Sequence, residues 1–411
     1  MTSNDSSPAT TDTRSPLRRL FSSRSFMALV ISNALGFTGE QMRLAAQSWW
    51  ILEQGGSKTE MGVAAGLRVI PILIITLYAG VLIDRVGGRR ILIIERMFLI
   101  LLAALTGLTL LFDQVEIWHV IVLSTLAGST IALGTPATQT LAADVVSADL
   151  RQSANSMNQL GNSMGRTLGP LLAGVLISVR SAALALFGLA IVYFVALIAT
   201  FGIRSKHIPQ DSSESALRQI IDGFVHIKQT PVLLWTNLLG LSFIPLAMLY
   251  PMIPVYAQDV LEVGEVGFGG LWGAVAIGQG TGAILIGSRG GFKRKSLGAI
   301  AGAGIFGIGL IGFGLSETYW LSFTFLLLNG LGLPLVVTSA ITLLQDHSKP
   351  EYRGRVMAVW AIMLQGVALA WMLGGFLLDV IGPVPTMFVA VGVGWALVLI
   401  PFFASKDFRR A

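Results

Sequence analysis

Long apolar stretches, separated by short polar segments, recur along the whole chain. Because a helix that crosses the hydrocarbon core of a bilayer needs about 20 predominantly apolar residues, each stretch predicts a membrane-spanning helix. The pattern predicts twelve such helices, at residues 26–50, 61–83, 91–112, 118–141, 154–178, 182–203, 231–257, 266–287, 297–315, 319–343, 356–380 and 385–404. An even number of spans places both termini on the same side of the membrane.

Composition supports a membrane protein and excludes several kinds of chemistry. Of the 411 residues, 54% are hydrophobic and 12% are charged, whereas soluble domains carry about 25% charged residues. The absence of cysteine excludes disulfides, thiolate metal sites and cysteine nucleophiles. The sequence also lacks a G-x-x-x-x-G-K-[ST] phosphate-binding loop and a nucleophile elbow. We therefore expect an all-α membrane protein that is not an enzyme and has no metal or cofactor.

The basic residues are distributed unevenly between the two sides of the predicted membrane. Loops on the side of the termini hold 22 of the 28 Lys and Arg residues, and the opposite loops hold Lys58 and Arg180. By the positive-inside rule, both termini are predicted to be cytoplasmic in a multi-pass protein of the bacterial inner (plasma) membrane. The net charge of +6 then needs no nucleic-acid partner to explain it.

An internal repeat divides the chain into two related halves. Asp144, Asp149 and Arg151 recur 202 residues later as Asp346, Glu351 and Arg353. Two parallel halves of six helices are a known transporter plan. The predicted units are a tail at 1–25, a bundle at 26–203, a cytoplasmic loop at 204–230, a bundle at 231–404 and a tail at 405–411. Within the loop, residues 216–228 show the spacing of an amphipathic surface helix.

The segment from Gly80 to Arg90, GVLIDRVGGRR, is similar to the loop between helices 2 and 3 that marks the major facilitator superfamily. The resemblance implies twelve helices in two pseudo-symmetric bundles, although the second-half copy has Gly287 in place of the aspartate. It also implies a cytoplasmic gate formed by Gly80, Asp84, Arg85, Gly87, Arg89 and Arg90. The alternative is a basic loop that only fixes the topology.

The predicted fifth helix carries a second motif. Its segment from Gly165 to Gly174, GRTLGPLLAG, resembles the fifth-helix motif of exporters in this superfamily. Asn158, Asn162 and Arg166 recur at helical spacing and are predicted to line a central cavity. The predicted exporter motif and cavity face comprise Asn158, Asn162, Gly165, Arg166, Gly169, Pro170 and Gly174. The alternative is tight helix packing through small residues.

A polar stripe on the first helix supplies the candidate coupling site. Asn33, Glu40, Arg43 and Gln47 share one helix face, and Arg68 lies at a similar depth on the second helix. Glu40 is the only carboxylate predicted near the middle of a span. Because a charge there costs about 2.5–3.5 kcal/mol, Glu40 is expected to face a cavity or a partner. It either exchanges the coupling proton or forms a permanent ion pair with Arg43.

We therefore predict a proton-driven exporter of an amphipathic small molecule, a drug or a siderophore, that works by alternating access in the lipid bilayer. Arg68 before Pro71 resembles the branch of enterobactin exporters and macrolide-efflux proteins, and the family implies a monomer. Ser124 stands where drug/proton antiporters carry an arginine, which keeps an importer or uniporter open. A non-transporting membrane sensor is a further alternative.

Overall fold

The structure is a computed structural model that describes residues 16–110, 115–147, 150–179, 182–205, 216–288, 292, 294–349 and 351–410. Within these residues every regular element is a helix. The first half contains α1 (Pro16–Ser22), α2 (Arg24–Glu53), α3 (Lys58–Gly66), α4 (Val69–Val86), α5 (Gly88–Thr109), α6 (Ile117–Ser129), α7 (Ile131–Val145), α8 (Arg151–Val179) and α9 (Ala182–Phe201).

The second half follows the connecting helix α10 (Ala216–Gln229). It contains α11 (Pro231–Gly240), α12 (Phe243–Leu246), α13 (Leu249–Val255), the π-helical turn η2 (Tyr256–Val260), α14 (Gly264–Ser288), α15 (Lys295–Gly314), α16 (Tyr319–His347), α17 (Arg353–Gln365), α18 (Val367–Val380), α19 (Pro383–Ala404) and α20 (Lys406–Arg410). Several predicted spans are therefore single helices, and others are interrupted within the span.

Ten helical segments of the described chain are long and apolar enough to cross a membrane. The helices α2 and α8 are not among these ten because they carry more polar side chains, although they contain 30 and 29 residues. At about 1.5 Å of rise per residue, both are long enough to cross the hydrocarbon core. The described helices are thus consistent with twelve spans, and the protein is an all-α, multi-pass membrane protein.

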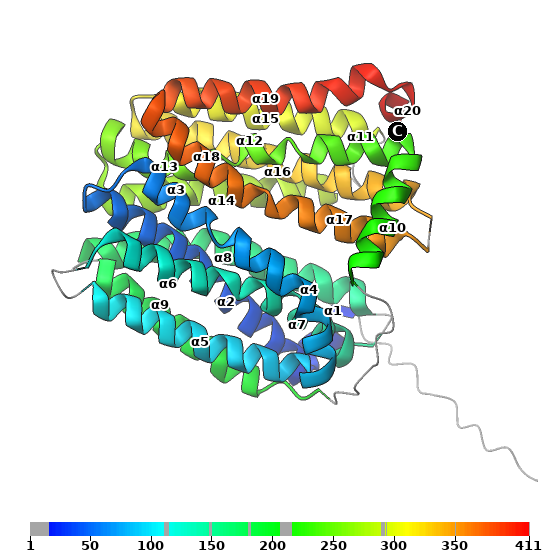
Figure 1. Cartoon of the computed structure of the whole chain (residues 1–411), viewed down its shortest axis with the longest axis horizontal. Coiled ribbons are helices and arrows are strands. Elements are labelled where there is room, and N and C mark those ends of the chain that lie inside the picture. The colour runs from blue at the N-terminus through cyan, green and yellow to red at the C-terminus, as the bar shows by residue number, and fades with distance from the viewer. Residues whose placement is uncertain are drawn as a thin grey trace, which may run out of the picture.

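The helices form two groups that lie side by side (Figure 1). The first-half helices, coloured blue to green, occupy one side, and the second-half helices, green to red, occupy the other. The helices α1, α10 and α20 lie at one end of the molecule, which we call the terminal end. The opposite end contains α3, α13 and the first turns of α19, and we call it the distal end.

The connecting helix α10 packs against the second half at the terminal end. Arg355 donates a hydrogen bond to Asp222 at 2.9 Å, and the rings of His226 and Tyr352 stack with centroids 4.5 Å apart. Ile227 of α10 is buried, whereas Ile221 and Phe224 are exposed. These three apolar residues of α10 are therefore divided between the protein core and the surface.

The two halves meet closely at the distal end. The start of α3 packs on α18, where a Cβ atom on Gly62 would lie 2.5 Å from the carbonyl oxygen of Trp371 and 3.1 Å from Cα of Gly375. The carboxylate of Asp379 accepts hydrogen bonds from the backbone N–H groups of Lys58 and Thr59, at 3.1 and 2.8 Å. We call this contact between α3 and α18 the distal seam.

A second contact between the halves joins α8 to α14. Gly174 lies directly against the backbone of Glu265, and a Cβ atom on Gly269 would lie 3.2 Å from the carbonyl oxygen of Pro170. Both glycines allow the two helix backbones to approach more closely than larger side chains would permit. The distal seam and this contact position the polar face of α8 between the halves.

Candidate functional site

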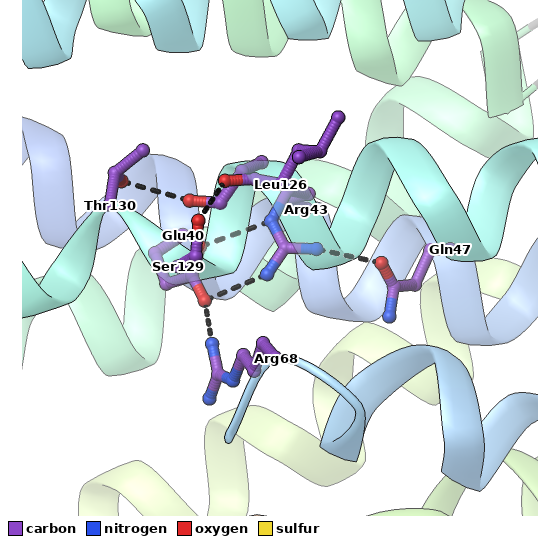
Figure 2. A network of polar contacts seen from close by, with 8 residues as sticks. Glu40, Arg43, Gln47, Arg68, Leu126, Ser129 and Thr130 are labelled. Atoms are coloured by element: carbon purple, nitrogen blue, oxygen red, sulfur yellow. Dashed lines mark hydrogen bonds and ion pairs between the residues drawn. The ribbon is translucent and has the colours of Figure 1, made fainter. Parts of the chain in front are cut away.

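Three residues of the polar stripe on α2, Glu40, Arg43 and Gln47, form a hydrogen-bonded network (Figure 2). Arg43 donates from Nε and Nη2 to the two carboxylate oxygens of Glu40, at 3.0 and 2.8 Å. Its Nη1 donates to Oε1 of Gln47 at 2.8 Å. These residues lie three and four positions apart, which brings their side chains together on one face of the helix. Glu40 and Arg43, two members of the predicted stripe, are therefore in direct contact.

Arg68 adds a second cation to Glu40 from another helix. It lies at the break between α3 and α4, and its Nη1 donates to Oε1 of Glu40. The break has a local cause, because Pro71 lacks an N–H group and its ring would clash with the carbonyl of Leu67 in a continuous helix. The sequence thus directs Arg68 toward α2 by interrupting the second span. We call Glu40, Arg43 and Arg68 the charged triad.

The charged triad is buried and carries a net positive charge. The exposed fractions of Glu40, Arg43 and Arg68 are 7%, 5% and 9%. One carboxylate is shared between two guanidinium groups, so the triad holds one positive charge more than it holds negative charges. Because a buried ion pair is strongly destabilised by the loss of one partner, the two arginines depend on the charge of Glu40.

Aromatic residues of the second half cover the charged triad. The guanidinium carbon of Arg68 lies 4.9 Å from the ring centroid of Trp371 in α18. Trp371 stacks on Tyr250 with centroids 4.4 Å apart, and Tyr250 lies 5.3 Å from Trp272 of α14. A cation over an indole face is attracted by the ring quadrupole. The triad of the first half is thereby linked directly to the second half.

A second buried pair, which the sequence analysis did not single out, lies on α5. Glu95 and Arg96 are 7% and 5% exposed, and their charged atoms are 3.4 Å apart. The carboxylate of Glu95 lies against Gly134 of α7, while the guanidinium of Arg96 lies against Gly36 of α2. Glu40 is therefore not the only buried carboxylate of the first half. The sequence contained a signal for this pair, because Glu95 and Arg96 stand side by side within an apolar run.

The predicted polar face of α8 contacts α2. Asn33 donates from Nδ2 to Oδ1 of Asn162 at 2.9 Å, and the glycines of α8 pack along the same helix. Cβ atoms on Gly165 and Gly169 would lie 2.8 and 2.6 Å from the backbone nitrogen of Thr38 and Cβ of Gln41. The buried Oδ1 of Asn158 has no hydrogen-bond partner within the described part of the chain. Tight packing and a polar face therefore coexist on this helix.

Arg166 projects from α8 toward the second half. Its Nη1 donates to Oε1 of Gln279 in α14 at 3.5 Å, and its guanidinium carbon lies 5.5 Å from the ring centroid of Phe37 in α2. Pro170 and Gly174 lie further along α8, where this helix packs on α14. The exporter-like segment therefore lies at the interface between the halves.

The predicted gate residues lie where α4 turns into α5. Gly80 and Asp84 belong to α4, and Gly87 joins the two helices with a φ of 91°, a conformation that favours glycine. Arg89 donates to the backbone oxygen of Phe201 at 3.1 Å, within the first half. The side chains of Arg85 and Arg90 are exposed. In this arrangement Arg89 binds the end of α9 rather than the opposite half.

The arrangement of charged side chains in the described residues shows which ions they could bind. Among them, no group of three or more His, Asp or Glu side chains is arranged to hold a metal ion. The charged side chains that are buried between the helices are instead carboxylates paired with arginines. Such an arrangement can hold or exchange protons and can bind ions.

Known proteins resemble this chain over most of its length. It is 26% identical to a staphyloferrin A transporter of Staphylococcus aureus, over 90% of this chain and 94% of that protein. It is 23% identical to macrolide efflux protein A of Streptococcus pyogenes, over 81% and 84% of the two chains. It is 22% identical to the enterobactin exporter EntS of Shigella boydii, over 97% and 94%.

Solved structures share the fold. A bacterial homologue of the human lysosomal transporter Spinster aligns with a TM-score of 0.72 at 14% identity, over 96% of this chain and 99% of that chain. The nucleoside transporter NupG aligns with a TM-score of 0.72 at 13% identity, over 93% and 99%. Residues 29–371 match the family described as the Major Facilitator Superfamily. The chain therefore belongs to the Major Facilitator Superfamily, and it is a membrane transporter rather than an enzyme.

Proposed function

We propose that the protein exports an amphipathic small molecule, a drug or a siderophore, in exchange for protons. The names of two relatives support export, because one is a macrolide efflux protein and another an enterobactin exporter. The observation that carries the proton-coupling part is the sharing of one buried carboxylate, Glu40, by Arg43 and Arg68. Within the charged triad, Glu40 is the group whose charge a proton can neutralise, because the guanidinium groups of Arg43 and Arg68 are already protonated.

The proposed coupling follows from the position of Arg68. With Glu40 ionised, Arg68 is held on α2 and lies over Trp371 of the second half. Protonation of Glu40 would remove the charge that holds both arginines, and the unpaired guanidinium groups would then be costly in this buried place. Separation of the halves at the distal seam would expose Arg68 to water. Proton uptake by Glu40 would thus favour opening toward the distal end.

The remaining parts of the proposal concern orientation and gating. We assign the terminal end to the cytoplasm of a bacterial cell, because the positive-inside rule places the basic loops there. In this orientation the distal seam closes the outer side. Asp84, Arg85, Arg89 and Arg90 are proposed to contribute to a cytoplasmic gate between the halves at the terminal end. The protein is proposed to act as a monomer.

The proposal is tested by measuring accumulation of labelled erythromycin, enterobactin and staphyloferrin A in a bacterium that lacks its own efflux systems. Cells expressing wild-type protein are compared with cells expressing Glu40→Gln, with and without an uncoupler. A matched control is Glu317→Gln, which changes an exposed carboxylate before α16. The amount and thermal stability of each variant in membranes are measured in parallel, so that loss of folding is recognised.

Proton-coupled export predicts that wild type lowers accumulation of at least one compound, and that both the uncoupler and Glu40→Gln abolish this effect. If folded Glu40→Gln still exports and remains sensitive to the uncoupler, Glu40 is a structural ion-pair residue. If wild type raises the accumulation of a compound, the export direction is wrong and the protein is an importer. A wild type that changes the accumulation of none of the compounds contradicts the proposed substrate classes.

A further inference from the structure

The four arginines within the spans are not equivalent. Arg43 and Arg68 share the carboxylate of Glu40, and Arg96 lies 3.4 Å from the carboxylate of Glu95. Arg166 differs, because its contacts are the amide oxygen of Gln279 and the ring of Phe37. Within the described part of the chain, no carboxylate forms an ion pair with Arg166. Three of these cations are thus paired with an anion and the fourth is not.

The surroundings of Arg166 are accessible to solvent. On α8, Gln159, Ser163 and Arg166 recur at helical spacing and are all exposed. A second exposed side of the same helix is apolar and includes Leu160 and Met164, with exposed fractions of 60% and 61%. Apolar exposure suits lipid, whereas exposed polar residues in a membrane helix are expected to face water or protein. Since Arg166 also reaches Gln279 of α14, its polar side faces the region between the halves.

We propose that Arg166 binds the anionic group, a carboxylate, of the amphipathic molecule that this protein transports. The inference rests on the proposed transport of an amphipathic substrate and adds the chemical class of that substrate. It requires neither proton coupling nor a particular direction of transport.

The chemistry of the site favours a carboxylate. An arginine presents its N–H groups in a planar fork that matches the two oxygens of a carboxylate. An isolated cation at membrane depth is costly, so an incoming anion would neutralise it, and the oxygens of the anion would accept these hydrogen bonds. The amide of Gln279 lies beside the guanidinium and offers a neutral polar contact, while Phe37 offers an aromatic surface. One end of the bound molecule would be anionic and the adjoining part apolar.

The geometry also links binding to both halves. Arg166 belongs to the first half, and Gln279 belongs to α14 of the second half. An anion placed on Arg166 would therefore lie beside residues that separate when the halves move apart. The positive charge of Arg166, which no carboxylate of the described residues neutralises, would attract an anion and repel a cation. The same site is expected to discriminate against molecules whose only charge is an amine.

The test uses purified full-length protein in nanodiscs of phosphatidylcholine, with 4-(1-pyrenyl)butyrate as the carboxylate probe. Its methyl ester is the matched neutral probe of nearly the same shape. Binding is followed by energy transfer from the tryptophans to pyrene, as the difference from empty nanodiscs. The variants are Arg166→Gln, Arg166→Lys and the control Lys406→Gln, which removes an exposed charge from α20. The assay contains no proton gradient, so failure of proton-coupled export would leave its result unaffected.

We expect wild type and Lys406→Gln to bind the carboxylate more tightly than the ester. Loss of one charge-assisted contact in Arg166→Gln should weaken carboxylate binding by about tenfold or more and leave ester binding unchanged. Arg166→Lys, which keeps the charge but loses the fork, should bind with intermediate affinity. A folded Arg166→Gln that keeps the preference, or a wild type that does not prefer the carboxylate, overturns the proposal.

A lipid headgroup is the other source of an anion at this depth. The titration is therefore repeated in nanodiscs that contain phosphatidylglycerol. If the substrate supplies the anion, carboxylate binding by wild type persists in these nanodiscs. If phosphatidylglycerol abolishes the difference between wild type and Arg166→Gln, the arginine binds lipid phosphate, and the assignment to the substrate is wrong.

Discussion

The guanidinium of Arg68 lies over the ring of Trp371, with 4.9 Å between the guanidinium carbon and the ring centroid. Arg68 belongs to the first half and is bound to Glu40, whereas Trp371 belongs to α18 of the second half. The indole therefore contacts a cation that is ion-paired with Glu40. In the proposed coupling, a change in the charge of Glu40 would act on the contact between the halves through Arg68 alone.

The energetic dependence of the arginines on Glu40 can be measured by a double-mutant cycle. Glu40→Gln should destabilise the protein by about 3–5 kcal/mol, because it leaves buried guanidinium groups without an anion. Adding Arg68→Gln should restore part of this loss, since one of the unpaired charges is then removed. Thermal unfolding in detergent, followed by tryptophan fluorescence, provides the measurement. Additive effects of the two substitutions would show that the two residues are not coupled.

The distal seam depends on the small size of Gly62. A leucine there would push against the carbonyl oxygen of Trp371, so Gly62→Leu should shift the population toward an arrangement open at the distal end. Because the chain has no cysteine, Gln258→Cys can report on this opening through its rate of reaction with an impermeant maleimide. We expect the rate to rise several-fold.

The matched control for the seam is Gly304→Leu in α15. A Cβ atom at Gly304 would have no neighbour within 4 Å, so this substitution adds the same side chain without a clash. It should leave the maleimide reaction of Gln258→Cys unchanged. Equal rates for Gly62→Leu and Gly304→Leu would mean that the α3–α18 contact does not limit opening.

Asp379 acts as a cap that one half supplies to a helix of the other. Its carboxylate accepts hydrogen bonds from the backbone of Lys58 and Thr59 and, at 2.6 Å, from the hydroxyl of Thr59. Asp379→Ala removes these acceptors and should weaken the closed arrangement by about 0.5–2 kcal/mol. Spin labels on Gln54→Cys and Leu315→Cys should then show more of the longer separation. Asp407→Asn, at the terminal end, is the control and should leave the distance distribution unchanged.

Protonation of Glu53 should stabilise closure of the distal end, which opposes the opening proposed for protonation of Glu40. Burial, and then the neighbouring carboxylate of Glu265, raise the pKa of Glu53 above its usual value. A raised pKa means that the closed arrangement binds this proton more tightly than a separated one. The extra stability is therefore present below the raised pKa and is lost as the pH rises through it.

This pH dependence can be followed with the same spin-label pair, between about pH 4 and pH 7. Glu53→Gln removes the titrating group, so the contribution of Glu53 is the difference between the curves of wild type and variant. An identical pH dependence in both proteins would contradict the role of Glu53.

Much of the fold was predictable because lipid imposes a simple length rule on apolar segments. The runs that predict the spans correspond to described helices, including the long polar helices α2 and α8. The contact between Glu40 and Arg43 was also predictable, since residues three apart on a helix are neighbours. The interrupted spans were less evident, although Pro71 marks one of the breaks.

Contacts between distant segments could not be predicted in the same way. The proximity of Arg68 to Trp371 depends on how α3 and α18 pack, and no periodicity in either segment encodes it. Glu95 and Arg96 are adjacent in sequence, yet they point toward α7 and α2, where Gly134 and Gly36 make room for them. The importance of such glycines becomes clear only when the side chains that fill their space are known.

The distal seam consists largely of glycines, backbone atoms and one capping carboxylate, whereas Arg166 lies on the polar side of α8. The contacts that close the distal end are therefore made by other residues than the one proposed to bind the substrate. Mutations around Arg166 can therefore alter selectivity without changing the distal seam, so the same transport fold could acquire new substrates in few evolutionary steps.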